Sequence, residues 1–252
     1  MKFSCTINGK RFEANLREPV DISIPLSVDG KNPSCYWADP AKAETIVMGD
    51  FIGSVKQGGP VNYQKITITP HGNGTHTECY GHITAETQTL NQCLRQFHFT
   101  AELITVIPEI KPSGDHVISK EELLSKVRFP GVNALVIRTM PNDDAKLIRH
   151  YSGTNPPYLE GEAARWMAQN HIDHLLIDLP SIDREVDGGQ LSAHKQFWQY
   201  PANIRTGATI TELIYVPASV NDGLYLLILQ ITSLETDASP SKPLLYKLTE
   251  VL

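Results

Sequence analysis

The spacing of apolar and polar residues predicts a chain that consists mainly of short strands. Phe3–Ile7 and Arg11–Leu16 are strand-like, and the Asn8-Gly9 pair between them is typical of a type I′ hairpin turn. Lys65–Thr69 alternates apolar and polar residues, as a half-buried strand does. Further strands are expected at Asp21–Leu26, Ala101–Ile107, Ala134–Arg138, His174–Leu179 and Gly223–Thr232. The last two are rich in Leu and Ile and are expected to be fully buried.

Helix signals are fewer and lie between the strands. Ser119 followed by Lys-Glu-Glu has the character of a capping box and predicts a short helix. Leu159–Asn170 places its small and apolar residues at helical spacing. The segment 29–62 is rich in Gly, Pro, Asn and Asp and is expected to be an ordered loop region. The pattern predicts one α/β or α+β domain over residues 1–252, with residues 1–20 as an N-terminal hairpin extension.

Composition and charge exclude several classes of protein. The 252 residues are 41 % hydrophobic and 20 % charged, which are ordinary globular values. The net charge of -6 disfavours a nucleic-acid partner. The longest apolar run, around Leu224–Ile231, is too short to span a bilayer, and the first residues lack the apolar run of a signal peptide. The four cysteines have no paired spacing. We therefore expect a cytoplasmic protein without a membrane partner.

Three histidines and a glutamate cluster in one short polar segment. His71, His76 and His82 lie within twelve residues, with Glu78 between them. His76 and Glu78 are two residues apart, so on a strand they face the same way. The preceding Gly-Asn-Gly allows a tight bend. Imidazole nitrogens and a carboxylate that converge suit a transition metal, and the alternative is a glycine-rich loop with exposed histidines.

The stretch Gly74–His82, GTHTECYGH, resembles the signature H-x-G-T-H-x-D-x-P-x-H of the metal-dependent cyclase/hydrolase family, which includes bacterial kynurenine formamidase and isatin hydrolase. Other segments resemble the family in the same order, namely DISIPL, LEGEAARWM, HLLIDLPSID, Ala193-His194-Lys195, Thr211-Glu212-Leu213 and Asp237-Ala-Ser-Pro-Ser. The resemblance implies a swivelling α/β/β domain with a mixed, barrel-like β core and few helices, usually a homodimer.

The chain departs from this signature at three positions. The family's aspartate is Glu78 here, and its proline is Tyr80. The first signature histidine falls on Gly72, whereas His71 stands one residue earlier. We expect a one-residue bulge at Gly72-Asn73 to restore His71 to the site.

The resemblance also implies roles for individual residues. His71, His76 and Glu78 would hold one metal ion, and His194 and Glu212 a second, with both glutamates bridging. The cofactor would be one or two Zn²⁺ ions, with Mn²⁺ as the alternative. His82 would be the general acid/base. Glu212 also stands out by itself, because it lies in the uncharged run ATITELIYV, where a carboxylate is costly to bury unless it is paired or bound to a metal.

The implied reaction is hydrolysis of an amide-type C–N bond by a metal-activated water. The substrate would be a small aryl formamide such as N-formylkynurenine, in tryptophan catabolism. Two alternatives stay open, a hydrolase of cyclic amides or lactams of the isatin type and a metal-binding homologue without turnover.

Several neighbouring residues have weaker indications of a role. Asp178 and Asp183 flank Pro180-Ser181 and are expected to be turn and cap residues that support the site. Trp37 and Tyr80 would line an aromatic substrate, although Trp37 is equally suited to the core. Cys79 is expected to be structural, because neighbours on a strand point to opposite faces.

Overall fold

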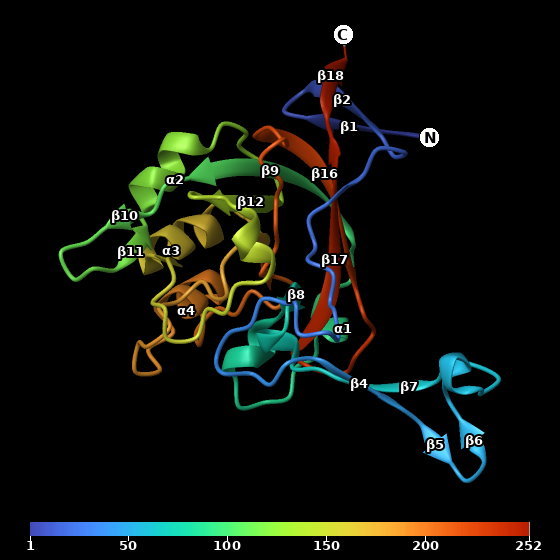
Figure 1. Ribbon diagram of the computed structural model, residues 1–252. Helices are drawn as coiled ribbons and strands as arrows, with labels where there is room; N and C mark the ends of the chain where they lie inside the picture. The colour runs from blue at the N-terminus through green and yellow to red at the C-terminus, as the bar shows by residue number, and fades with distance from the viewer. Residues whose placement is uncertain (252) are drawn as a thin grey trace.

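A closed β-barrel forms the centre of the molecule (Figure 1). The computed structural model describes residues 1–251. Seven strands follow one another around the barrel in the order β16-β9-β12-β14-β15-β8-β17, and pairing of β17 with β16 closes it. Their bounds are β8 His76–Glu78, β9 His98–Val106, β12 Ala134–Thr139, β14 His174–Ile177, β15 Thr209–Glu212, β16 Gly223–Ile231 and β17 Ala238–Lys247. The predicted α/β class with a mixed, barrel-like core is confirmed.

Four of the strands, β9, β12, β14 and β15, run parallel, and the other barrel strands pair antiparallel with their neighbours. Every residue of β12 and β14 is buried, because the barrel interior covers one face of these strands and other elements cover the second. The covering helices α2 (Lys120–Lys126), α3 (Gly161–Gln169) and α4 (Ser192–Trp198) gather on one side of the barrel (Figure 1). Helix α1 (Leu90–Cys93) is a single turn.

The helix predictions agree with the structure within a few residues. The Ser119 hydroxyl accepts a hydrogen bond from the Glu122 N–H at 3.2 Å and so caps α2. In α3 the buried residues are Ala163, Ala164, Met167 and Ala168, which form the apolar face that the spacing predicts. Helix α4 (SAHKQFW) was not predicted, because it has no capping signal comparable to Ser119 of α2: its N-cap residue is Leu191, which makes no side-chain cap hydrogen bond.

The N-terminal hairpin is present as β1 (Lys2–Ile7) and β2 (Lys10–Asn15), with Asn8 and Gly9 both at positive φ. Strand β18 (Thr249–Val251) pairs with β2. A second small sheet contains β10 (Glu109–Ile110), β11 (His116–Ile118) and β13 (Tyr158–Leu159). Among residues 1–251, no helix is long and apolar enough to cross a membrane.

Three local predictions were wrong. Lys65–Thr69 was expected to be a half-buried strand, but the strand there, β7 (Gln64–Thr67), is exposed at every residue. Of the segment Asp21–Leu26 only Asp21 lies in a strand, the two-residue β3 (Val20–Asp21), because the chain leaves the sheet after pairing with two residues of β17. The stretch 29–62 is not simply a loop, since it contains most of an arm that projects from the barrel (Figure 1). The arm consists of β4 (Lys42–Thr45), β5 (Val47–Met48), β6 (Phe51–Ile52), the 3₁₀ turn η1 (Val55–Gln57) and β7 (Gln64–Thr67).

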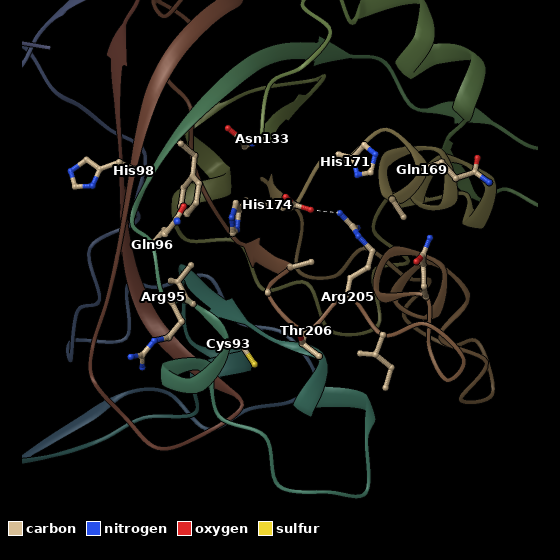
Figure 2. Close-up of a pocket in the computed structure, with 18 residues that line it drawn as sticks. Cys93, Arg95, Gln96, His98, Asn133, Gln169, His171, His174, Arg205 and Thr206 are labelled. Carbon is tan, nitrogen blue, oxygen red and sulfur yellow. Dashed lines mark hydrogen bonds and ion pairs between the residues drawn. The ribbon is translucent and has the colours of Figure 1, made fainter. Parts of the chain in front are cut away.

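The amino ends of the parallel strands border a cavity of about 800 Å³, shown in Figure 2. His174, at the start of β14, lines this cavity and is only 5 % exposed. Its Nδ1 lies 2.9 Å from the Thr209 hydroxyl, and its ring centroid is 3.8 Å from that of Phe99. The cavity is lined by neither His71, His76 nor Glu78.

The buried His174 should make stability depend on pH. Burial lowers the pKa of His174 from 6.5 to about 4, so between these values the unfolded chain binds a proton that the native protein does not. The free energy of unfolding should therefore fall as the pH falls through this window, by at most about 3 kcal/mol from this group. Urea unfolding at pH 7 and pH 4.5 measures the difference. It should be smaller in His174→Gln, and equal differences in both proteins would contradict the expectation.

Candidate active site

The histidine-rich segment folds as a turn, a strand and a turn. The 3₁₀ turn η2 (Pro70–Gly72) carries His71, β8 carries His76 and Glu78, and the 3₁₀ turn η3 (Tyr80–Ile83) carries His82. Gly72 is required for close approach, because a Cβ there would lie 2.3 Å from the Cβ of Ala38. In this arrangement Nδ1 of His71 lies 3.0 Å from Oε2 of Glu78. His71 therefore reaches Glu78, although it stands one residue before the position of the first signature histidine.

Two distant segments contribute Glu212 and His194, which complete a His/Glu cluster. The cluster consists of His71, His76, Glu78, His82, His194 and Glu212. Glu212, the last residue of β15, pairs with His76 across the sheet, and its Oε2 lies 3.4 Å from Nε2 of His76. His194, in the first turn of α4, places Nε2 at 3.0 Å from Oε1 of Glu78 and 3.9 Å from Oε1 of Glu212. The structure therefore brings all five expected ligands together. Of these, only His71 has an appreciably exposed side chain, at 28 %.

Within the described part of the chain, one ring nitrogen of His76 is hydrogen-bonded and the other is not. Nδ1 of His76 lies 2.9 Å from the carbonyl oxygen of Gly74, which can only accept, so Nδ1 carries the hydrogen. The other ring nitrogen, Nε2, faces Oε2 of Glu212. Nε2 is buried and has no hydrogen-bond partner among residues 1–251. A buried imidazole nitrogen and a carboxylate oxygen that face each other require a proton or a metal ion between them.

Glu78 presents a second unpaired atom. Its Oε2 is buried and accepts no well-formed hydrogen bond among the described residues, although His71 is close. Sets of ligand atoms within 4.8 Å of one another include His71 with His76 and Glu78, and Glu78 with His82 and His194. Neutral imidazoles and carboxylates are the donors that Zn²⁺ and similar ions prefer. The residues present therefore fit a divalent metal ion.

Asp183 holds His194 in place. Its Oδ2 lies 2.6 Å from Nδ1 of His194, and its carboxylate accepts the backbone N–H groups of Ala193 and His194 at 2.6 and 3.2 Å. Burial opposes ionisation of Asp183, but these hydrogen bonds outweigh it and lower its pKa. The acid thus caps α4 and turns Nε2 of His194 toward the glutamates. Asp178 does not contact the cluster, because it pairs with buried Lys146 at 2.8 Å and accepts from Thr139.

Asp237 is a site residue that sequence reasoning missed. It stands immediately before β17, and its Oδ2 lies 2.8 Å from Nε2 of His71 and 3.5 Å from Nδ1 of His82. The sequence interpretation included this residue only in the closing turn Asp237-Ala-Ser-Pro-Ser. Its position becomes clear only from the strand register. Ala238 of β17 pairs with Glu78 of β8, and this pairing places Asp237 beside the histidine segment.

Charge in the cluster is dominated by carboxylates. Burial opposes protonation of His71 and of His194, but hydrogen bonds with neighbouring carboxylates outweigh it and raise the pKa of each to about 10. For Glu78, burial opposes ionisation, yet the charge of His82, the hydrogen bond of His194 and the close approach of His71 lower its pKa. Positive charge at the centre is therefore favourable, and protons and a metal ion would compete for the same lone pairs.

The other expected neighbours differ in their environment. Trp37 is 72 % exposed, so the alternative that placed it in the core was wrong. Tyr80 is partly buried and packs against the larger core cluster. Cys79 is fully buried in the second core cluster, as expected for a structural residue.

Comparison with known proteins agrees with this geometry. The Cyclase family model matches residues 20–184, more than half of the chain. The chain is 26 % identical to kynurenine formamidase of Bacillus cytotoxicus, covering 90 % of this chain and 97 % of that protein. It is 27 % identical to the enzyme of the same name from Bacillus cereus, covering 88 % and 94 %.

Solved structures share the fold. A potential metal-dependent hydrolase with cyclase activity superposes with a TM-score of 0.65 at 18 % identity, covering 91 % of this chain and 97 % of that one. An isatin hydrolase bound to the product analogue thioisatinate superposes with a TM-score of 0.62 at 16 % identity, covering 93 % of both chains. From the extent of the family match, together with the shared barrel, this chain belongs to the cyclase family.

Proposed function

We propose that this protein is a metal-dependent hydrolase of an amide-type C–N bond in a small aromatic molecule. The observation that carries the proposal is the pair of unpaired buried atoms, Nε2 of His76 and Oε2 of Glu78, at the centre of the His/Glu cluster. A cation is the simplest way to satisfy both. An aryl formamide such as N-formylkynurenine is the proposed substrate, because the curated relatives are kynurenine formamidases. That substrate would place the reaction in tryptophan catabolism.

In this proposal His71, His76 and Glu78 hold one divalent ion, and His194 and Glu212 hold a second or complete the shell of the first. The ion is Zn²⁺, with Mn²⁺ as the alternative, since both accept imidazole and carboxylate ligands. When bound, it supplies a Lewis acid that lowers the pKa of water and polarises a carbonyl. Glu78 and Glu212 contribute two negative charges, which keep the ion in a site that is otherwise almost closed to water.

His82 is the proposed general acid/base. Its side chain is 33 % exposed, and Nε2 lies 3.9 Å from Oε2 of Glu78, so the ring stands between the buried cluster and solvent. From there it can accept a proton from the attacking water and donate it to the leaving nitrogen. Hydrolysis of an aryl formamide would then release formate and an aromatic amine.

Metal content and turnover together test this function. Purified protein should contain a stoichiometric divalent ion, and it should hydrolyse formanilide to aniline and formate, with activity lost on chelation and restored by Zn²⁺ or Mn²⁺. Isatin is the second substrate to assay, and turnover of isatin alone would favour a lactam hydrolase. Stoichiometric metal without turnover of any amide, lactam or lactone would instead favour a metal-binding homologue.

We also infer a homodimer, and the projecting arm supports it. Apart from Gly53, no residue of the segment 42–67 is buried, and its exposed apolar side chains include Val47, Met48, Val55, Val61, Tyr63 and Ile66. An isolated hairpin is marginally stable in water, and exposed apolar patches mark interfaces. A second copy of the chain is the proposed occupant, because exchange of identical arms closes a two-fold assembly, and the arm continues directly into the turn that carries His71.

Charged residues on the arm should dissociate this dimer. We expect light scattering after gel filtration to give twice the chain mass for the wild type and the single mass for Met48→Glu/Ile66→Glu, whose two side chains are 59 % and 60 % exposed. Ile110→Glu introduces the same charge at a 68 % exposed residue of β10 and should remain dimeric. A monomeric wild type, or a dimeric double variant, would refute the arm as the interface.

The cellular location is also part of the proposal. Cys5, Cys35, Cys79 and Cys93 are all free thiols. Free thiols, two of them buried, are typical of proteins of the reducing cytoplasm, which is the location we propose.

A further inference from the structure

Each imidazole of the cluster has one nitrogen directed inward and one anchored outside. His76 is anchored by the carbonyl of Gly74, and His194 by the carboxylate of Asp183. His71 and His82 share a single anchor, Asp237, through Nε2 and Nδ1 respectively. Asp237 is thus the one acidic side chain in residues 1–251 that contacts two imidazoles of the cluster from outside.

We infer that Asp237 is a positioning residue that fixes the orientation of His71 and His82 together. An ionised carboxylate only accepts hydrogen bonds, so it selects the N–H at Nε2 of His71, with which it is hydrogen-bonded, and favours an N–H at Nδ1 of His82, with which it is in ion-pair contact. The other nitrogen of each ring then faces Oε2 of Glu78, at 3.0 Å for His71 and 3.9 Å for His82. One carboxylate therefore directs one nitrogen of each of the two rings toward the atom of Glu78 that lacks a hydrogen-bond partner.

The backbone keeps Asp237 in register with the site. Its carbonyl accepts the N–H of Cys79 at 3.0 Å, one residue beyond Glu78, and the Leu90 N–H binds the preceding carbonyl of Thr236 at 2.8 Å. The first bond joins Asp237 to the segment that carries the histidines, and the second holds its neighbour Thr236 against α1, so the backbone of Asp237 is fixed beside that segment. The side chain itself is 37 % exposed, so a substitution there should not open a cavity in the core.

This placement also separates the roles of the two rings. Since His71 and His82 are paired through the same oxygen, a change at Asp237 should alter both the affinity for metal, through His71, and proton transfer, through His82. That consequence rests on the proposed function. The orientation of the rings does not, because it can be measured in protein without metal.

The experiment is ¹⁵N-histidine NMR on metal-free wild type, Asp237→Asn, Asp237→Ala and the control Glu235→Gln. Glu235 lies two residues away and binds Thr89 and Asn91 instead of a histidine. We expect slowly exchanging N–H signals at Nε2 of His71 and Nδ1 of His82 in the wild type and the control, and loss of both in Asp237→Ala. Both signals persisting in Asp237→Ala would overturn the inference, as would their absence from the wild type.

Zn²⁺ affinity provides the second measurement. Loss of an outer hydrogen-bond partner typically weakens metal binding by roughly 10–100-fold, so the Kd of Asp237→Asn should rise by about that factor, with partial recovery in Asp237→Glu. Equal thermal stability in all variants would exclude a merely structural effect. An unchanged Kd in Asp237→Asn and Asp237→Ala would contradict positioning through His71. A wild type that binds no Zn²⁺ but keeps both N–H signals would reject the proposed function and leave the positioning role intact.

Discussion

Glu78→Gln should abolish both metal binding and hydrolysis. Glu78 is 1 % exposed, and it is the residue that His71, His82 and His194 all face, at 3.0, 3.9 and 3.0 Å. The amide is almost isosteric but neutral, so the ion loses its central negative ligand, and one of the carboxylate oxygens becomes an N–H₂ group. We expect the metal Kd to rise by more than roughly 100-fold, beyond the effect of losing an outer partner. Turnover should fall by at least roughly 10³-fold, which corresponds to about 4 kcal/mol.

A buried carboxylate elsewhere provides the matched control for Glu78. Glu102 is 2 % exposed and accepts the backbone N–H groups of Arg128 and Phe129 at 2.7 and 3.1 Å, in contact with none of the histidines. Glu102→Gln should lower the melting temperature, because an amide cannot accept both bonds with the same strength, yet it should keep the full metal content. Metal content by mass spectrometry and formanilide turnover decide the comparison. If Glu78→Gln retains stoichiometric metal, Glu78 is not a ligand.

The barrel strands show which features of the fold can be predicted from sequence. Leu-rich runs such as His174–Leu179 and Gly223–Thr232 have a composition that favours buried strands, and both are barrel strands. Asp21–Leu26 has a similar pattern, but only Asp21 pairs within β3 and Ser23 forms an isolated bridge with Ile214, because the number of available partners depends on the rest of the sheet. The arm was predicted only in part. Lys65–Thr69 alternates apolar and polar residues and overlaps β7, but every residue of β7 is exposed, so the alternation does not reflect burial. The other arm strands are two to four residues long and gave no signal.

In the site, too, some residues can be predicted from their spacing along the chain, whereas others are placed only by the packing of distant segments. His76 and Glu78 lie on the same face of β8 because a strand alternates its side chains, and that rule needs only their spacing. His194 and Glu212 were expected near them only through the family resemblance, because their approach depends on how β15 and α4 pack. Asp237 had no local signal at all. A lone aspartate before a strand resembles any turn residue, and its contact with His71 depends on the pairing of β17 with β8.

His82→Ala should separate catalysis from metal binding. The expected loss of turnover is roughly 10²–10⁴-fold, the usual contribution of a general acid/base, while the metal content stays near that of the wild type. The reason is its position. His82 is the most exposed of the four imidazoles, at 33 %, and Nε2 is 3.9 Å from Oε2 of Glu78, farther than the 3.0 Å of His71 or His194. It can therefore exchange protons with a substrate that the buried rings cannot reach.

Anilides with different ring substituents test whether His82 protonates the leaving nitrogen. If His82 protonates the leaving nitrogen, anilides with electron-withdrawing ring substituents need that proton less, so His82→Ala should impair their hydrolysis less than that of formanilide itself. His82→Gln keeps a polar side chain without a titrating nitrogen and should behave like the alanine variant. Loss of the metal from either variant would make His82 a ligand. In that case another group would have to move the proton, and the geometry leaves Asp237, 3.5 Å from the same ring, as the next carboxylate to test.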